Sequence, residues 1–234
     1  GDAAMRMFNA DGSEGVMCGN GVRCTAEFLY THGVRRDCIR IDTPSAGQRV
    51  LHRVGDGLWQ VEMGRFTAAP DAVGAVGLGG GPLLDVPLCA GGRAWRVHCV
   101  AVGNPHCVLF THEPPPTGSE LVAWGRALGR HPAFPGGINV EFAQPISPTG
   151  LAVTVWERGS GATLACGTGA CAVAAAAVLT GRCPRGAPIL VQLPGGTLEV
   201  CVQRDDTVLL TGDAAATFSG TVLIQPCKAP RGVV

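Results

Sequence analysis

Apolar and polar residues alternate along five short stretches of this 234-residue chain. An alternation with a period of two is typical of a β-strand that buries one of its faces. Each stretch is flanked by turn-forming residues such as glycine, proline or aspartate. The pattern therefore predicts strands at residues 58–63, 95–102, 151–156, 198–202 and 208–211.

Two other segments have the pattern of helices. Residues 22–30 follow Cys18, and Gly33 then supplies the residue type that commonly ends a helix. Residues 170–179 are apolar on nearly every side, and Gly181 follows them. A helix without a polar face has to be enclosed by other elements, so we expect strands around it. The chain is thus predicted to be an α+β protein in which long helices are wrapped by short strands.

The same turn opens both helices. The motif Cys-Gly-x-Gly occurs at 18–21 and again at 166–169, which is 148 positions later, and Gly33 and Gly181 have the same separation. Other pairs lie 150 positions apart, namely Pro44 and Pro194, Val50 and Val200, and Asp56 and Asp206. An internal duplication explains these offsets and predicts two pseudo-symmetric halves.

The length and the repeat together indicate two domains of roughly 100–150 residues each. Segment 67–87 is rich in glycine, alanine and proline, so we expect the junction there. The first half would comprise residues 1–66 together with 213–234 and would be incomplete at its start. The second half would comprise residues 67–212.

The composition narrows the class of protein. Hydrophobic residues make up 46% of the chain, charged residues 15%, and the formal net charge is zero. A neutral chain gives no electrostatic reason to bind nucleic acid or an anionic membrane. No apolar run approaches the roughly 18 residues of a membrane span. We therefore expect a soluble protein that binds neither nucleic acid nor a membrane.

The cysteines and the single lysine restrict the chemistry. Eleven cysteines are an odd number, and in a chain of this length they favour a reducing cytoplasm over a disulfide framework. The one lysine, Lys228, lies between prolines near the C-terminus. An enzyme that uses pyridoxal phosphate needs a well-placed lysine for its Schiff base, so this cofactor is not expected.

Thiols at helix N-termini suggest acid–base chemistry. A helix start exposes unpaired N–H groups and carries roughly half a positive charge, which favours a thiolate and can lower its pKa from about 8.5 toward neutrality. Glycines would let a substrate anion reach those N–H groups. Two opposed thiols suit the inversion of a stereocentre, because one removes a proton while the other adds a proton to the opposite face. Repulsion between two thiolates predicts that the pair shares one proton.

Structural explanations compete with each of these interpretations. A single Cys-Gly-x-Gly is more often a turn beside an inert cysteine, and only the duplication at matched helix starts favours chemistry. Residues 103–106, Gly-Asn-Pro-His, read equally well as a turn. Glu157 and Arg158 have the pattern of a surface ion pair, and Asn9 and Asn139 that of turn or cap residues.

Taken together, these segments resemble the diaminopimelate epimerase family, whose members need no pyridoxal phosphate. Proline racemase-like relatives share the two-cysteine scheme, but they typically carry histidine where Asn20 stands, and they lack the Glu-Arg pair. The matching segments are residues 8–14 (Phe-Asn-Ala-Asp-Gly-Ser-Glu), 17–24, 103–106, 139–141 (Asn-Val-Glu), 157–159 and 164–172.

The resemblance implies a fold and a set of site residues. The fold would be two pseudo-symmetric α/β halves, each a mixed β-sheet barrel around a central helix. Cys18 and Cys166 would exchange the proton, and His106 and Glu157 would tune their protonation and contact substrate ammonium groups. The reacting carboxylate would be held by Gly19, Asn20, Gly167 and Thr168. The distal end of the amino acid would be bound by Asn9, Asn104, Asn139 and Arg158.

The resemblance also leaves alternatives open. Family members normally carry several dozen residues before the Phe-Asn-Ala-Asp segment, whereas this sequence starts seven residues before Phe8. We therefore expect an opened first barrel with an exposed sheet edge, in a fragment or a weakened enzyme. Residues 225–234 receive no role.

The function implied is interconversion of LL- and meso-diaminopimelate, a small-molecule substrate, without cofactor or metal. The alternatives are a racemase of another amino acid, an inactive ligand-binding remnant and a metal protein, and a homodimer is one option for assembly.

Overall fold

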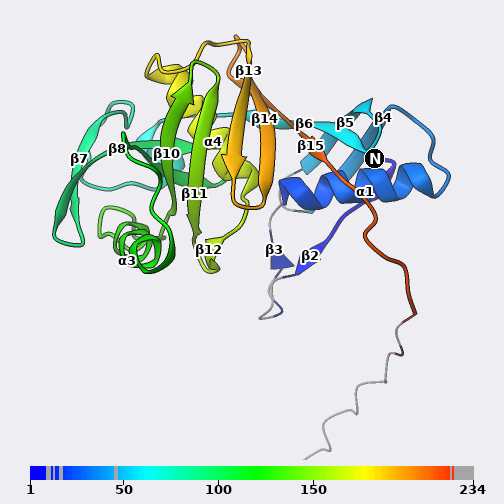
Figure 1. The fold of residues 1–234 in the computed structure, drawn as a ribbon, viewed down its shortest axis with the longest axis horizontal. Coiled ribbons are helices and arrows are strands. Elements are labelled where there is room, and N and C mark those ends of the chain that lie inside the picture. The colour runs from blue at the N-terminus through cyan, green and yellow to red at the C-terminus, as the bar shows by residue number, and fades with distance from the viewer. Residues whose placement is uncertain (9–11, 13, 16–17, 45–46, 222, 224–234) are drawn as a thin grey trace, which may run out of the picture.

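The computed structural model describes residues 1–8, 12, 14–15, 18–44, 47–221 and 223. It is a mixed α+β fold in which strands far outnumber helices (Figure 1). The helices are α1 (Gly19–Thr31), α2 (Pro70–Val73), α3 (Gly118–Gly129) and α4 (Gly167–Leu179). The strands are β1 (Ala3–Ala4), β2 (Met7–Phe8), β3 (Glu14–Gly15), β4 (Cys38–Thr43), β5 (Gly47–Gly55), β6 (Leu58–Arg65), β7 (Val86–Ala90), β8 (Arg93–Ala101), β9 (Pro105–Phe110), β10 (Asn139–Ser147), β11 (Gly150–Glu157), β12 (Gly161–Thr163), β13 (Pro188–Leu193), β14 (Gly196–Val202) and β15 (Thr207–Asp213).

One large sheet runs through the described part of the chain. Its strand order is β1-β4-β5-β6-β15-β14-β13-β11-β10-β9-β8-β7, with β12 paired to β11, and β2 and β3 form a separate hairpin. Three neighbours are parallel (β1 with β4, β9 with β10, and β11 with β13) and the other pairs are antiparallel, so the sheet is mixed. The last strand, β15, lies between β6 and β14 and joins the early strands to the late ones.

Helix α4 is the buried centre of the larger group of strands. It contacts β8, β9, β10, β13, β14 and β15, and it lies among these strands in Figure 1. Every side chain from Ala170 to Ala177 is fully buried. The run of alanines explains how strands can approach the helix from so many sides, because a methyl group is the smallest side chain that still favours a helix. The prediction that this apolar helix is enclosed by strands is confirmed.

Helix α1 has the same length as α4 but different surroundings. It packs along β4, β5, β6 and β15 with Val22 and Ala26, both fully buried. Its opposite side faces solvent, where Phe28 is 59% exposed. The strand path ends at the two-residue strand β1, which pairs with β4, so the described strands of the large sheet cover only one side of α1 (Figure 1).

The five predicted strands are all present, as β6, β8, β11, β14 and β15. The predicted helix ends are also confirmed, because Gly33 and Gly181 each follow a helix with a positive φ, 111° and 71°. Segment 67–87 is closely packed on β8. Thr67 bridges to Ala101 in β8, and Val73 and Leu83 belong to a second hydrophobic cluster with Val97. None of the helices in the described part is long and apolar enough to cross a membrane.

The close packing around α4 predicts that added volume there destabilises the protein. Ala174→Leu places three extra carbons in a fully enclosed position, so we expect the free energy of unfolding to fall by about 1–3 kcal/mol. Ala123→Leu makes the same change on the exposed side of α3 and should alter it by less than about 0.5 kcal/mol. Urea denaturation of both variants measures the difference, and equal effects would contradict the enclosed position of α4.

Candidate active site

The two Cys-Gly-x-Gly motifs form matched helix caps. Cys18 is the N-cap of α1 and Cys166 is the N-cap of α4, with φ and ψ of −131° and 114° in one and −131° and 115° in the other. In each cap the backbone N–H three residues later donates to the sulfur at 3.3 Å, from Gly21 to Cys18 and from Gly169 to Cys166. The duplicated sequence therefore builds the same local structure twice, with a sulfur in the capping position.

The first glycine of each motif lets the two helix starts meet. A Cβ built on Gly19 would lie 3.7 Å from the Cα of Gly167, and one built on Gly167 would lie 3.5 Å from the Cα of Gly19. Either Cβ would also lie 3.2 Å from a methyl group of Leu210, which is in β15 beneath the junction. A side chain at either position would therefore crowd Leu210 and reach van der Waals contact with the facing helix start, so glycine leaves the most room at this junction.

The second glycine of each motif makes room for the capping sulfur. A Cβ on Gly169 would lie 3.3 Å from the sulfur of Cys166 and 2.8 Å from Oε1 of Glu141. A Cβ on Gly21 would lie 3.6 Å from the sulfur of Cys18. The steric requirement for glycine is therefore strongest at Gly169, where a Cβ would collide with Glu141, and weaker at Gly21, where it would make ordinary contact with the sulfur.

The two thiols differ in their environment. Cys166 is buried, with 7% of its surface exposed, whereas Cys18 is only half-buried. Burial raises the pKa of Cys166 to about 12, and the charges of Glu141 and Glu157 act in the same direction. The hydrogen bonds with Thr168 and Gly169 lower this pKa but do not compensate. The expectation that a helix start lowers the thiol pKa is therefore wrong for Cys166, because loss of solvent outweighs the helix dipole.

His106 forms a fully buried pair with Glu141. The Nδ1 atom of His106 lies 2.7 Å from Oε1 of Glu141, and its Nε2 atom lies 3.0 Å from Oδ1 of Asn104. Both partners of the pair are inaccessible to solvent, and burial raises the pKa of Glu141. Both ring nitrogens of His106 are thus engaged. Glu141 also lies against the first turn of α4, because a Cβ on Gly169 would lie 2.8 Å from its Oε1.

Asn139 joins two of the other predicted site segments. Its amide nitrogen donates to the carbonyl of Pro105 at 3.1 Å, and its amide oxygen accepts the backbone N–H of Arg158 at 2.8 Å. Asn139 is 5% exposed and stands opposite His106 in the parallel pair of β9 and β10. In this structure its side chain therefore fixes the loop at 103–106 to the end of β11.

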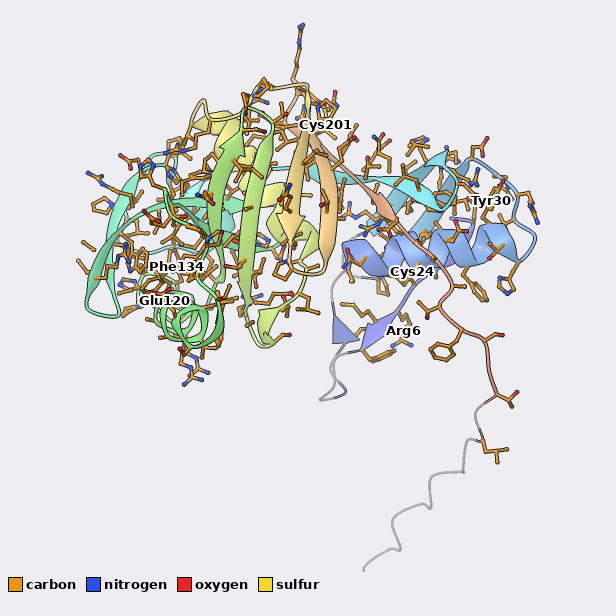
Figure 2. The ribbon with its side chains drawn as sticks, in the orientation of Figure 1. Arg6, Cys24, Tyr30, Glu120, Phe134 and Cys201 are labelled. Atoms are coloured by element: carbon orange, nitrogen blue, oxygen red, sulfur yellow. The ribbon has the colours of Figure 1, made fainter. Side chains whose placement is uncertain are left out.

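Glu157 and Arg158 lie where β11 turns toward β12. Glu157 accepts the hydroxyl of Thr163, and Arg158 donates to the carbonyl of Gly136 at 3.0 Å. They do not form the ion pair with each other that a surface Glu-Arg dipeptide suggests. Both line a cavity of about 590 Å³, which lies between this turn and the loop after α3; Phe134, labelled in Figure 2, is also part of its wall.

The remaining predicted residues lie near the helix starts or outside the described part. The hydroxyl of Thr168 is 3.4 Å from the sulfur of Cys166, and the amide oxygen of Asn20 accepts from Arg23 at 3.1 Å. Asn9 lies outside the described residues, as do residues 225–234. Within the part of the chain that the structure describes, no group of three or more His, Cys, Asp or Glu side chains could hold a metal ion.

Sequence reasoning did not single out Glu141 as a site residue. It occupies the third position of the Asn-Val-Glu segment, at the centre of the buried first part of its strand, residues 139–143. An isolated carboxylate within a buried strand was the available signal, because a buried charge needs a specific partner.

Solved structures of other proteins share this fold. A predicted epimerase from Pseudomonas aeruginosa superimposes with a TM-score of 0.61 at 20% identity, covering 93% of this chain and 80% of that one. A probable proline racemase from Agrobacterium radiobacter gives a TM-score of 0.68 at 17% identity, covering 96% of this chain and 73% of that one. The chain thus has the fold found in these racemase and epimerase structures.

Sequence comparison identifies the family within this fold. The family model described as diaminopimelate epimerase matches residues 1–68 and 98–217. Diaminopimelate epimerases from Synechococcus sp. and Nostoc punctiforme are 47% and 44% identical to this chain, over 94% of its length and 78% of theirs. The chain belongs to the diaminopimelate epimerase family.

The raised pKa of Cys166 predicts slow alkylation. At pH 8 a thiol with a pKa of about 12 is ionised in only about one molecule in ten thousand. We expect iodoacetamide to label Cys166 at least about ten times more slowly than the exposed Cys24, which lies on α1 (Figure 2), and labelling of Cys166 to accelerate as the pH rises toward 12. Peptide mass spectrometry resolves the two sites. Equal rates at pH 8 would contradict a protonated, buried Cys166.

The position of Glu141 predicts a shift in this pH dependence. Glu141→Gln keeps the size of the side chain but removes a negative charge that disfavours the Cys166 thiolate. Labelling of Cys166 should therefore begin at a lower pH than in the unmodified protein. Glu120→Gln, an exposed change on α3 that is marked in Figure 2, serves as the control and should leave the profile unchanged. An unaltered profile in Glu141→Gln would show that its charge does not reach the thiol.

Proposed function

We propose that this protein interconverts LL- and meso-diaminopimelate without a cofactor, in the synthesis of lysine and peptidoglycan precursors. The observation that supports it most directly is the contact between two helix starts, each capped by a cysteine. Membership of the diaminopimelate epimerase family supplies the substrate. The ten described cysteines are all free thiols, which fits a reducing cytoplasm, where we place the activity.

Electrostatics favour an anion at the junction of α1 and α4. Each helix start carries roughly half a positive charge, so two starts in contact repel each other unless a negative group lies between them. A substrate α-carboxylate is such a group, and the first-turn N–H groups can donate to it. We assign this role to Gly19, Asn20, Gly167 and Thr168.

The two thiols then act on opposite faces of the α-carbon. In one direction the sulfur of Cys18 takes the α-proton, negative charge spreads onto the carboxylate, and the S–H of Cys166 delivers a proton to the other face. The raised pKa of Cys166 suits it as the proton donor of the resting enzyme. The reverse reaction exchanges the roles, so each turnover moves one proton from the substrate and returns another. Donors aimed at the carboxylate stabilise its developing charge by about 3–4 kcal/mol each.

The second set of residues would select the substrate. We propose that Asn9, Asn104, Asn139 and Arg158 hold the distal amino-acid group, whose L configuration stays unchanged. The exposed guanidinium of Arg158 at the wall of the 590 Å³ cavity is a suitable partner for a distal carboxylate. His106 would act through Glu141, and the charge of Glu157 raises the pKa of Cys166, so both would adjust the protonation of that thiol.

Removal of either thiol tests the two-base reaction. Cys18→Ala and Cys166→Ala should each reduce kcat for epimerisation of LL-diaminopimelate by about 1,000-fold or more, since either loss removes a general acid or base. Cys24→Ala removes an exposed cysteine of the same helix and should keep full activity. Proton NMR in heavy water follows both epimerisation and exchange at the α-carbon. Full turnover by either Cys18→Ala or Cys166→Ala would refute the two-base mechanism. The substrate assignment would be refuted if the protein turned over amino acids with a single stereocentre but not diaminopimelate.

A further inference from the structure

Arg23 is a buried cation that the proposed reaction does not yet use. It lies in the second turn of α1, and only 4% of its surface is exposed. Among the described residues, no carboxylate lies within 4.0 Å of its guanidinium group. Burial lowers its pKa, but a guanidinium group remains charged at neutral pH. Among the described residues the cation is therefore buried without an ion pair, although the charge of Asp213 favours it from a longer distance.

The contacts of Arg23 point to the helix junction. Its Nη2 donates to Oδ1 of Asn20 at 3.1 Å, its Nη1 donates to the carbonyl of Gly19 at 3.2 Å, and its Nε donates to the carbonyl of Asp213 at 3.4 Å. A guanidinium group has donors only, so the Asn20 atom that it contacts must be the amide oxygen. Arg23 thereby fixes the orientation of this amide and leaves its two N–H donors for another acceptor.

Asn20 is in the right place to use these donors. A Cβ built on Gly167, the first residue of α4, would lie 3.6 Å from Oδ1 of Asn20. The amide therefore lies at the meeting point of the two helix starts, where the backbone N–H groups of both helices are unpaired. An acceptor bound at this junction would lie close to both the Asn20 amide and the Arg23 guanidinium group.

The neighbouring strand provides space for the guanidinium group. A Cβ on Gly212 of β15 would lie 2.9 Å from both Cζ and Nη2 of Arg23, and 2.7 Å from a methyl group of Leu198. Any side chain at position 212 would thus displace Arg23. The cation occupies a fitted site formed by α1, β14 and β15.

The duplication places this cation in one half only. The position equivalent to Asn20 in the second motif is Thr168, and the position equivalent to Arg23 is Cys171, a fully buried thiol. The two helix starts therefore differ in charge, because a buried arginine stands beside the first and a buried thiol occupies the matching position beside the second. This asymmetry places a positive charge on one side of the shared junction.

We infer that Arg23 is a positioning residue for the reacting carboxylate, which orients the Asn20 amide toward it and supplies a buried positive charge beside it. The inference rests on the proposed function. Negative charge spreads onto the carboxylate as the α-proton leaves, so a fixed cation on this side stabilises the transition state more than the bound substrate. Loss of Arg23 is therefore expected to act on kcat more than on KM.

A double-mutant cycle with Asn20 tests whether Arg23 acts through the amide. We expect Arg23→Gln to lower kcat about 100-fold with KM changed by less than about fivefold, and Arg23→Lys to give an intermediate loss because it keeps the charge but not the planar fork. In Asn20→Ala protein, adding Arg23→Gln should cost only a small further factor, of about tenfold or less. Arg36→Gln, at an exposed ion pair, is the control and should leave kcat unchanged.

The outcomes separate this inference from the proposed function. The role of Arg23 would be overturned if Arg23→Gln kept kcat within threefold of the unmodified enzyme. It would also be overturned if the fold-losses in kcat caused by Arg23→Gln and Asn20→Ala simply multiplied in the double variant. Thermal unfolding checks folding of each variant, and if Arg23→Gln does not fold, the same cycle with Arg23→Lys decides.

A second measurement does not depend on the substrate. If the unmodified protein does not turn over diaminopimelate, the proposed function fails. The role of Arg23 can still be tested, with sulfate in place of the substrate carboxylate. Sulfate should slow iodoacetamide labelling of Cys18 in the unmodified protein at constant ionic strength, and Arg23→Gln should weaken this protection at least about fivefold. Equal protection in both proteins would overturn the inference.

Discussion

The contact between the N-termini of α1 and α4 constrains the rest of the structure. Like ends of two helix dipoles repel, and each end exposes N–H groups that require acceptors. At the junction Gly19 faces Gly167, and a methyl group of Leu210 lies close to both. The fold thus maintains a concentrated positive region at this junction. Strand β15, which carries Leu210 between β6 and β14, holds the two helices in this arrangement.

The surroundings of this junction are not symmetric, although the caps are. Cys18 is half-buried on a helix with one exposed side and a buried arginine in its second turn. Cys166 is buried, on a helix enclosed by strands, with Glu141 against its first turn and a pKa raised to about 12. The proposed inversion of one carbon needs a base and an acid at the same time, and two matched caps in different surroundings suit that proposal better than strict symmetry would.

Buried polar side chains connect the site to the sheet. Asn139 fixes the loop at 103–106 to the end of β11, and the pair of His106 and Glu141 spans neighbouring parallel strands. Each of these contacts replaces water by a specific partner, as a buried polar group requires. Segments that are far apart in the sequence are therefore held in one register by the same strands that enclose α4.

The sequence by itself determined both long helices, their cysteine caps and closing glycines, and five strands, because these depend on local periodicity and on residues with restricted backbone preferences. It did not determine α3, because the amphipathic pattern of that helix is short and is flanked by loop residues on either side. It also did not determine the strand order that places β15 between β6 and β14, because that order depends on long-range pairing. Nor did it determine the pKa of Cys166 or the burial of Arg23 and Glu141. Charge and solvent exposure are set by the elements that pack around a residue, and only the tertiary structure brings those elements together.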